Sequence, residues 1–137
     1  MAIMTIFPLL ILPGLFYAVF AAPNGGAGVN QYLATQVFSI DMAGGSQWVL
    51  THGHLFIIFA IFCLFVEIIK SVRPTTQAMI DLSLSVGVFI IMLILFLLVP
   101  GFGTTEFFLI MLMSILDFMA GAIVMVNSAK RDVGFDH

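Results

Sequence analysis

The chain has few charged residues: Asp, Glu, Lys and Arg make up 8% of its 137 residues, whereas hydrophobic residues make up 62%. A small soluble domain has too little interior to bury so large an apolar fraction. The sequence therefore predicts an integral membrane protein. The formal net charge of −3 is small and scattered, so there is neither a basic patch for nucleic acid nor a polybasic tract for anionic lipid headgroups.

Cysteine is almost absent as well. Cys63 is the only one, so no disulfide can form within the chain. It lies in an apolar run, where a thiol behaves as a small hydrophobic side chain. The sequence also lacks a glycine-rich phosphate loop, a nucleophile elbow, a His-Glu zinc motif and a CxxC pair. We therefore expect no enzyme activity from this chain alone.

Long apolar runs dominate what the sequence does contain. A helix needs roughly 20 mainly apolar residues to cross the hydrocarbon core of a membrane. Runs of this kind cover residues 4–22, 48–69, 78–99 and 106–126, and a tail follows at 127–137. The expected fold is an all-α integral membrane protein with a single membrane domain over residues 1–137. Its four transmembrane helices would form an up-down bundle.

The basic residues predict an orientation. Lys70 and Arg73 lie in the loop after the second expected span, and Lys130 and Arg131 follow the fourth. The loops after the first and third spans contain neither Lys nor Arg. Because Lys and Arg in short loops favour the cytoplasmic side, we expect a multi-pass protein of a bacterial inner membrane with both termini in the cytoplasm.

The outer loop between the first two expected spans is too long for a simple hairpin. Its apolar residues recur at helical spacing: Val29, Tyr32, Leu33, Val37 and Ile40. We therefore expect a short amphipathic helix over 29–40 that lies along the outer membrane surface. The stretch contains no Lys or Arg, so apolar burial would hold it there. The alternative is a packed surface loop whose periodicity arises by chance.

Asp117 lies near the middle of the fourth expected span. An unpaired ionised carboxylate at that depth costs about 2.5–3.5 kcal/mol on insertion scales, so Asp117 should face protein and be paired or protonated. Ser114 and Gly121 lie about one helical turn on either side and give the same face small side chains that permit close helix packing. Asp117 is either a proton- or cation-handling group or a carboxyl that hydrogen-bonds to a neighbouring helix.

Four further charged residues gather around the loop between the second and third expected spans: Glu67, Lys70, Arg73 and Asp81. Glu67 and Lys70 are three residues apart on one helical face and can form an ion pair. Asp81 is within reach of Lys70 or Arg73. We expect ion pairs at the inner interface, with the long basic side chains extending to water. No second ionisable group is expected at the depth of Asp117, and the spacing shows no relay between it and Glu67.

Two histidines, His52 and His54, begin the second expected span beside Trp48 and Thr51 at the outer interface. On a helix, side chains two residues apart point to nearly opposite sides and cannot share a metal ion. In an extended segment they would share a face but leave a zinc site incomplete. We expect one histidine to cap this end of the span and the other to hydrogen-bond to the outer loop, with no metal site.

Three functions remain open. The first is a non-catalytic accessory subunit of a larger inner-membrane complex, respiratory or photosynthetic, whose partners are other integral membrane subunits and lipid. The second is a small oligomeric proton or cation transporter or channel that uses Asp117. The third is the binding of a chlorophyll-type pigment or haem through a single axial ligand, His54. The first two functions require no cofactor.

Overall fold

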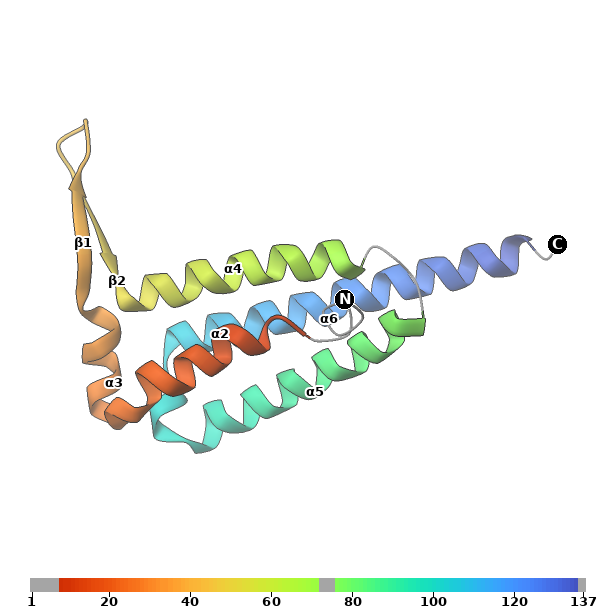
Figure 1. The fold of residues 1–137 in the computed structure, drawn as a ribbon, viewed down its shortest axis with the longest axis horizontal. Coiled ribbons are helices and arrows are strands. Elements are labelled where there is room, and N and C mark those ends of the chain that lie inside the picture. The colour runs from red at the N-terminus through yellow and green to blue at the C-terminus, as the bar shows by residue number, and fades with distance from the viewer. Residues whose placement is uncertain (1–7, 72–75, 136–137) are drawn as a thin grey trace.

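The structure is a computed structural model that describes residues 8–71 and 76–135; residues 1–7, 72–75 and 136–137 lie outside this description. It is mostly helical (Figure 1). Three long helices form the body of the described part: α4 (His52–Ser71), α5 (Thr76–Leu98) and α6 (Thr105–Phe135). Helix α6 packs against both α4 and α5.

Helices α4 and α6 begin at one end of this body, and α5 ends there (Figure 1). A β-hairpin projects from the same end, which we call the hairpin end. The short turn η3 (Pro100–Phe102) connects α5 to α6 at this end. Because α5 runs antiparallel to α4 and α6, residues of the three helices that are equally far from the hairpin end lie at similar levels of this body (Figure 1).

The long helices have the length and composition of membrane spans. Among the described residues, three helical stretches are long and apolar enough to cross a membrane: His52–Lys70, Met79–Leu98 and Thr105–Asn127. Many of their large apolar side chains point outward, and Phe62 is 67% exposed and Leu98 75% exposed. Outward apolar surface of this extent is what a lipid-facing helix presents. The structure thus supports the predicted helical membrane protein.

The N-terminal segment lies along the long helices. It contains α2 (Ile11–Phe16), the π-helical turn η1 (Tyr17–Ala21), the 3₁₀ turn η2 (Ala22–Asn24) and α3 (Gly25–Ala34). Helix α2 packs on α4 and contacts α6. The first expected span, 4–22, falls on this segment, and its residues 4–7 lie outside the described part of the chain.

The prediction of a surface helix over 29–40 is wrong in its second half. Helix α3 ends at Ala34, and the chain continues as two antiparallel strands, β1 (Gln36–Asp41) and β2 (Gln47–Thr51). Helix α4 therefore begins at His52 instead of residue 48, and Trp48 lies in β2. The fold is therefore mostly helical and not all-helical, because it contains this β-hairpin.

The hairpin has one apolar face and one mainly polar face. Residues directly opposite each other in an antiparallel pair share a face, and Phe38 pairs with Leu50 and Ile40 with Trp48. The other face carries Ser39, Asp41, Gln47 and Val49. At the turn, the Gly45 N–H donates to the Met42 carbonyl over 3.0 Å. Gly45 has a φ of 92°, which glycine adopts without steric cost.

The C-terminal end of α6 is longer than expected. The fourth span was predicted to end at 126 and to be followed by a tail at 127–137, but the helix continues to Phe135. Polar residues do not end a helix by themselves, because exposed Lys, Arg and Ser residues are tolerated on its surface. Helix α6 therefore continues beyond the end of its apolar stretch.

Tyr17 lies at the centre of the apolar core near the hairpin end. Its side chain is fully buried, and its ring centroid lies 5.0 Å from that of Phe107 and 5.5 Å from that of Phe102. The Tyr17 hydroxyl donates to the Gly101 carbonyl over 3.0 Å and lies 2.6 Å from Thr104 Oγ1. Thr104 in turn accepts from the Phe107 N–H at the start of α6. These contacts attach the N-terminal segment to the connection between α5 and α6.

Candidate functional site

Three buried carboxyl groups come from the three long helices. Glu67 on α4 is 0% exposed, Asp81 on α5 is 8% exposed and Asp117 on α6 is 4% exposed. We call these three residues the carboxylate cluster. Asp117 lies within electrostatic range of both Glu67 and Asp81. All three belong to stretches that are apolar enough to cross a membrane.

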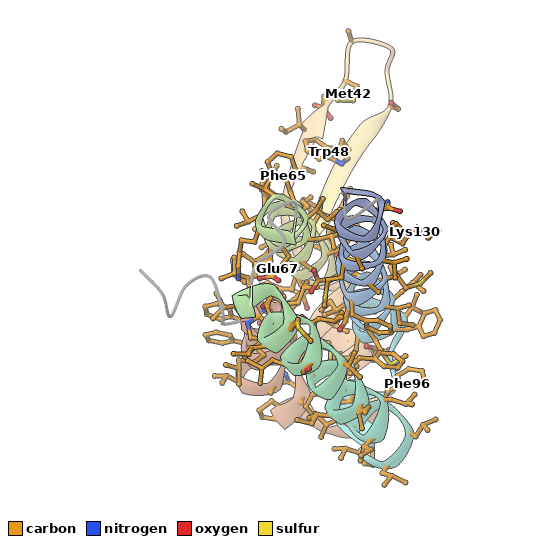
Figure 2. The ribbon with its side chains drawn as sticks, turned by 90° about the vertical axis from the view of Figure 1, so that its right-hand side faces the viewer. Met42, Trp48, Phe65, Glu67, Phe96 and Lys130 are labelled. Atoms are coloured by element: carbon orange, nitrogen blue, oxygen red, sulfur yellow. The ribbon has the colours of Figure 1, made fainter. Side chains whose placement is uncertain are left out.

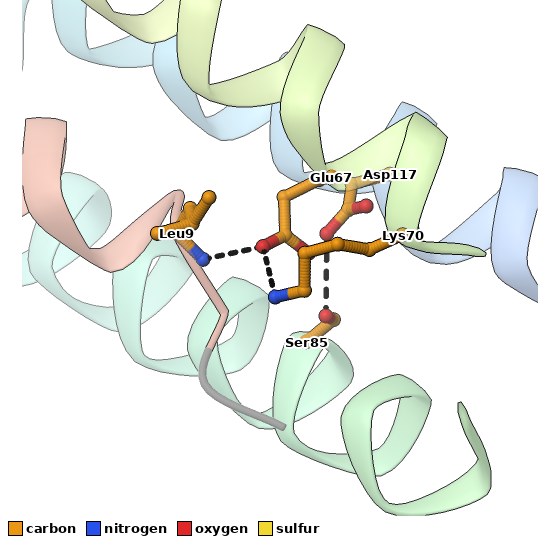
Figure 3. Close-up of polar contacts among 5 residues, drawn as sticks. All are labelled: Leu9, Glu67, Lys70, Ser85 and Asp117. Carbon is orange, nitrogen blue, oxygen red and sulfur yellow. Dashed lines mark hydrogen bonds and ion pairs between the residues drawn. The ribbon is translucent and has the colours of Figure 1, made fainter. Parts of the chain in front are cut away.

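Asp117 faces α5. The hydroxyl of Ser85, itself 3% exposed, donates to Asp117 Oδ2 over 3.2 Å (Figure 3). One turn further along α6, Gly121 also faces α5, because a Cβ placed on it would lie 3.6 Å from the Leu82 side chain. Ser114 on the preceding turn is buried. This face of α6 is therefore a packing face inside the protein, as its small residues indicated.

Glu67 connects the N-terminal segment to α4. Its Oε1 atom accepts a 2.9 Å hydrogen bond from Lys70 Nζ and a 2.7 Å hydrogen bond from the Leu9 backbone N–H (Figure 3). The Leu9 N–H needs such an acceptor, because donors at the start of a helical segment have no partner one turn earlier. The predicted Glu67–Lys70 ion pair is confirmed, but it lies inside the protein: Glu67 is fully buried and Lys70 is 13% exposed.

The prediction that no second ionisable group lies at the depth of Asp117 is wrong. Asp117 lies roughly 18 Å along α6 from the start of that helix, and Glu67 lies roughly 22 Å along α4 from its start, at the usual rise per residue. Both helices start at the hairpin end, so the two carboxyl groups reach similar depths. The predicted spans start at residues 48 and 106 and place the two groups at different depths, so the later start of α4 at His52 was needed to reveal this proximity. Distance along the chain concealed it.

Two oxygens of the carboxylate cluster are buried without a hydrogen-bond partner in the described part of the chain: Glu67 Oε2 and Asp81 Oδ1. Lys70 contributes a positive charge within electrostatic range of Asp81 and Asp117. Arg73, the other basic residue expected here, lies outside the described residues. Buried polar atoms are usually paired because leaving them unpaired costs free energy, so these two oxygens mark a place where a proton could be accepted.

The two histidines make the two contacts expected of them. The Thr51 backbone N–H donates to His54 Nδ1 over 3.1 Å, and Thr51 Oγ1 lies 3.4 Å from the His54 N–H. Together these contacts cap the start of α4, in the manner of a capping box with histidine in place of Glu or Gln. His52 Nδ1 lies 3.2 Å from the carbonyl oxygen of Tyr32 in α3, which belongs to the outer loop.

These contacts indicate which ring nitrogen carries the proton in the neutral form of each histidine. His54 Nδ1 accepts a hydrogen bond, so the ring proton is on Nε2. His52 Nδ1 faces a carbonyl, which can only accept, so this nitrogen carries the proton and Nε2 has the lone pair. Of the two, His52 is thus the residue that presents an unprotonated Nε2. No three His, Cys, Asp or Glu side chains within 8–71 and 76–135 are grouped to hold a metal ion.

Of two other residues singled out from the sequence, Trp48 lies apart from the carboxylate cluster, and Cys63 lies one helical turn from Glu67 on α4. Trp48 is 47% exposed on the apolar face of the hairpin, where its ring meets that of Phe38 edge-on with the centroids 6.0 Å apart. Cys63 is a buried free thiol on α4.

No protein-family model matches the chain, and neither a curated protein nor a solved structure is significantly similar to it. The carboxylate cluster and the hairpin end are therefore the features of this chain that bear on its function.

Proposed function

We propose that the protein handles protons at the carboxylate cluster, as a small transporter or channel of a bacterial inner membrane. In this proposal the N-terminal segment is a fourth crossing and completes an up-down bundle. The hairpin end lies at the outer surface, and both termini are cytoplasmic, as the positions of Lys70 and Lys130 favour.

One observation carries the proposal: within residues 8–71 and 76–135, buried carboxyl groups on three different apolar helices lie within electrostatic range of one described lysine, Lys70, and two of their oxygens have no hydrogen-bond partner among these residues. Three ionised carboxylates and one ammonium group would leave uncompensated negative charge in the membrane interior, which is costly. Binding a proton removes that cost. Neighbouring carboxyl groups commonly share protons for this reason.

The side chains also supply a path for a proton between helices. Asp81 and Ser85 are four residues apart on α5 and lie on one face of that helix, and Ser85 donates to Asp117 on α6. A hydroxyl both donates and accepts hydrogen bonds. In this proposal, Ser85 passes a proton between Asp81 on its own helix and Asp117 on α6.

Measurement of proton flux tests the proposal. The purified protein is reconstituted into liposomes that contain a pH-sensitive dye, and a pH gradient is imposed. The parent should conduct protons above the level of empty liposomes, and Asp117→Asn should abolish the difference. Asp41→Asn provides the matched control, because Asp41 is an exposed carboxylate on the hairpin. Absence of flux from the parent would remove the transport proposal.

A second candidate function is a non-catalytic accessory subunit of a membrane complex. The hairpin favours it, because it extends beyond the long helices with Met42 and Trp48 on it (Figure 2). The 41–49% exposure of Phe38, Ile40, Met42 and Trp48 gives this projection an apolar surface. Native gel electrophoresis in mild detergent separates the candidates: a stable co-migrating partner together with no proton flux supports the subunit, and a partner-free conducting protein supports the transporter.

A further inference from the structure

A groove lined largely by aromatic side chains lies at the hairpin end, between the N-terminal segment and the first turns of α4. Its volume is about 320 Å³, within the range of small-molecule sites. The lining includes Phe16, Phe20, Tyr32, His52, Leu55 and Phe59. The rings of Phe16 and Phe59 meet edge-on with centroids 5.3 Å apart. Such a lining fits a flat, apolar ring.

His52 gives this groove a polar group of defined character. Its ring stacks on Tyr32, with centroids 4.6 Å apart and planes 7° apart, and its Nδ1–H donates to the Tyr32 carbonyl. Nε2 is left as a hydrogen-bond acceptor, and none of the described residues donates to it. Contacts of this kind, with one ring nitrogen fixed by a backbone carbonyl, hold a histidine in position for a partner at the other nitrogen.

The groove opens on the apolar outer surface of the protein. Three of its lining residues are well exposed: Phe16 at 45%, Phe20 at 53% and Leu55 at 40%. His52 begins α4, the first residue of a candidate membrane span. The groove thus lies near the end of the span, where molecules with an apolar body and a polar tip collect in a bilayer. A ligand would enter from the lipid.

We propose that this groove binds a membrane-soluble ring compound that carries a hydroxyl donor, of the phenol or hydroquinone class. The aromatic side chains contact the ring, and His52 Nε2 accepts the hydrogen bond from its hydroxyl. The site is separate from the carboxylate cluster: Glu67 lies roughly 22 Å further along α4 at the usual rise per residue. Binding here does not depend on whether Asp117 handles protons.

The test compares two probes that differ only at their two ring oxygens, which carry hydrogens in one probe and methyl groups in the other. Decylhydroquinone and its dimethyl ether share the ring and the alkyl chain, but the ether has no hydroxyl hydrogen. Binding to the full chain in lipid nanodiscs is measured by calorimetry under reducing conditions, with empty nanodiscs as the blank. The parent should prefer the hydroquinone about fivefold, the effect of one net hydrogen bond. Equal binding of the two probes would show a groove filled by any apolar chain and would overturn the proposal.

Variants of the two histidines test whether His52 Nε2 is the atom responsible for the preference for the hydroquinone over its dimethyl ether. His52→Phe keeps a ring beside Tyr32 and removes Nε2, so the parent's preference for the hydroquinone should disappear. His52→Asn keeps an N–H donor for the Tyr32 carbonyl but has no atom at the position of Nε2, so it should behave in the same way. His54→Gln is the matched control and should retain the preference, because His54 does not line the groove. If either correctly folded His52 variant keeps the full preference, the inference is wrong.

Discussion

Ser85 on α5 donates a 3.2 Å hydrogen bond to the carboxylate of Asp117 on α6, and both side chains are almost completely buried. This contact joins two helices that are each apolar enough to span a membrane. It shows how the fold accommodates a carboxyl group in the middle of an apolar helix: the oxygen has a donor on the neighbouring helix.

Replacing Ser85 by alanine should weaken the contact between α5 and α6. Interhelical hydrogen bonds in membrane proteins contribute about 0.6 kcal/mol on average, so Ser85→Ala should lower the free energy of unfolding by about this amount. Ser83→Ala is the matched control, because Ser83 donates to the Met79 carbonyl within its own helix. Unfolding in mixed micelles measures both variants. Equal stability of the two would show that the Ser85 contact contributes nothing.

Truncation of Glu67 should have a much larger effect. Glu67→Ala removes the acceptor of both the Leu9 N–H and Lys70 Nζ, and loss of one partner from a buried ion pair costs about 3–5 kcal/mol. Glu67→Gln should cost less, because its amide oxygen can still accept from the Leu9 N–H. Hydrogen exchange at the Leu9 amide reports this contact directly. It should accelerate in Glu67→Ala and stay slow in Glu67→Gln; the same slow exchange in both would contradict the assignment.

The cap of α4 can be tested at His54. His54→Ala leaves the Thr51 N–H without its partner and should destabilise the protein by about 1 kcal/mol, the usual value for a lost cap. His54→Gln should preserve stability, since Thr and Gln at this spacing form an ordinary capping box. Thermal unfolding in detergent compares the three proteins. A Gln variant as unstable as the Ala variant would show that the histidine acts in another way.

Two glycines provide a matched pair for the packing near the hairpin end. A Cβ on Gly101 would lie 2.6 Å from the Ala22 carbonyl oxygen, so Gly101→Ala should force the backbone apart and cost about 1–3 kcal/mol. A Cβ on Gly87 in α5 would have open space around it. Gly87→Ala should therefore stabilise the helix by about 0.5–1 kcal/mol. Chemical unfolding measures both, and similar effects of the two substitutions would contradict the close approach at Gly101.

The sequence predicted the long helices well because about 20 apolar residues in succession have few other stable arrangements. It also placed Asp117 on a packing face and paired Glu67 with Lys70, since both follow from helical spacing. The hairpin was missed because the helical spacing of Tyr32, Leu33 and their neighbours was extended past Ala34. The alternation of Phe38 with Ile40 and of Trp48 with Leu50, around Gly44-Gly45, would have indicated two strands.

The carboxylate cluster was missed for a different reason. Asp117 is 36 or more residues from the other two members, and it comes within electrostatic range of them only through the packing of α6 against α4 and α5. The contact of Glu67 with Leu9 depends on the path of the N-terminal segment, which no local pattern specifies. Similarly, the proton positions on His52 and His54 depend on which backbone group each ring meets. Tertiary packing sets these relationships.

Proton flux through liposomes containing Asp117→Glu or Asp117→Asn tests the central claim most directly. Asn has nearly the size of Asp but cannot bind a proton, whereas Glu is one methylene longer and keeps a carboxyl group that can bind a proton. The carboxylate cluster predicts that Asp117→Glu retains much of the parent's flux and that Asp117→Asn falls to the level of empty liposomes. Equal flux through the Asn variant and the parent would contradict the claim that Asp117 handles protons.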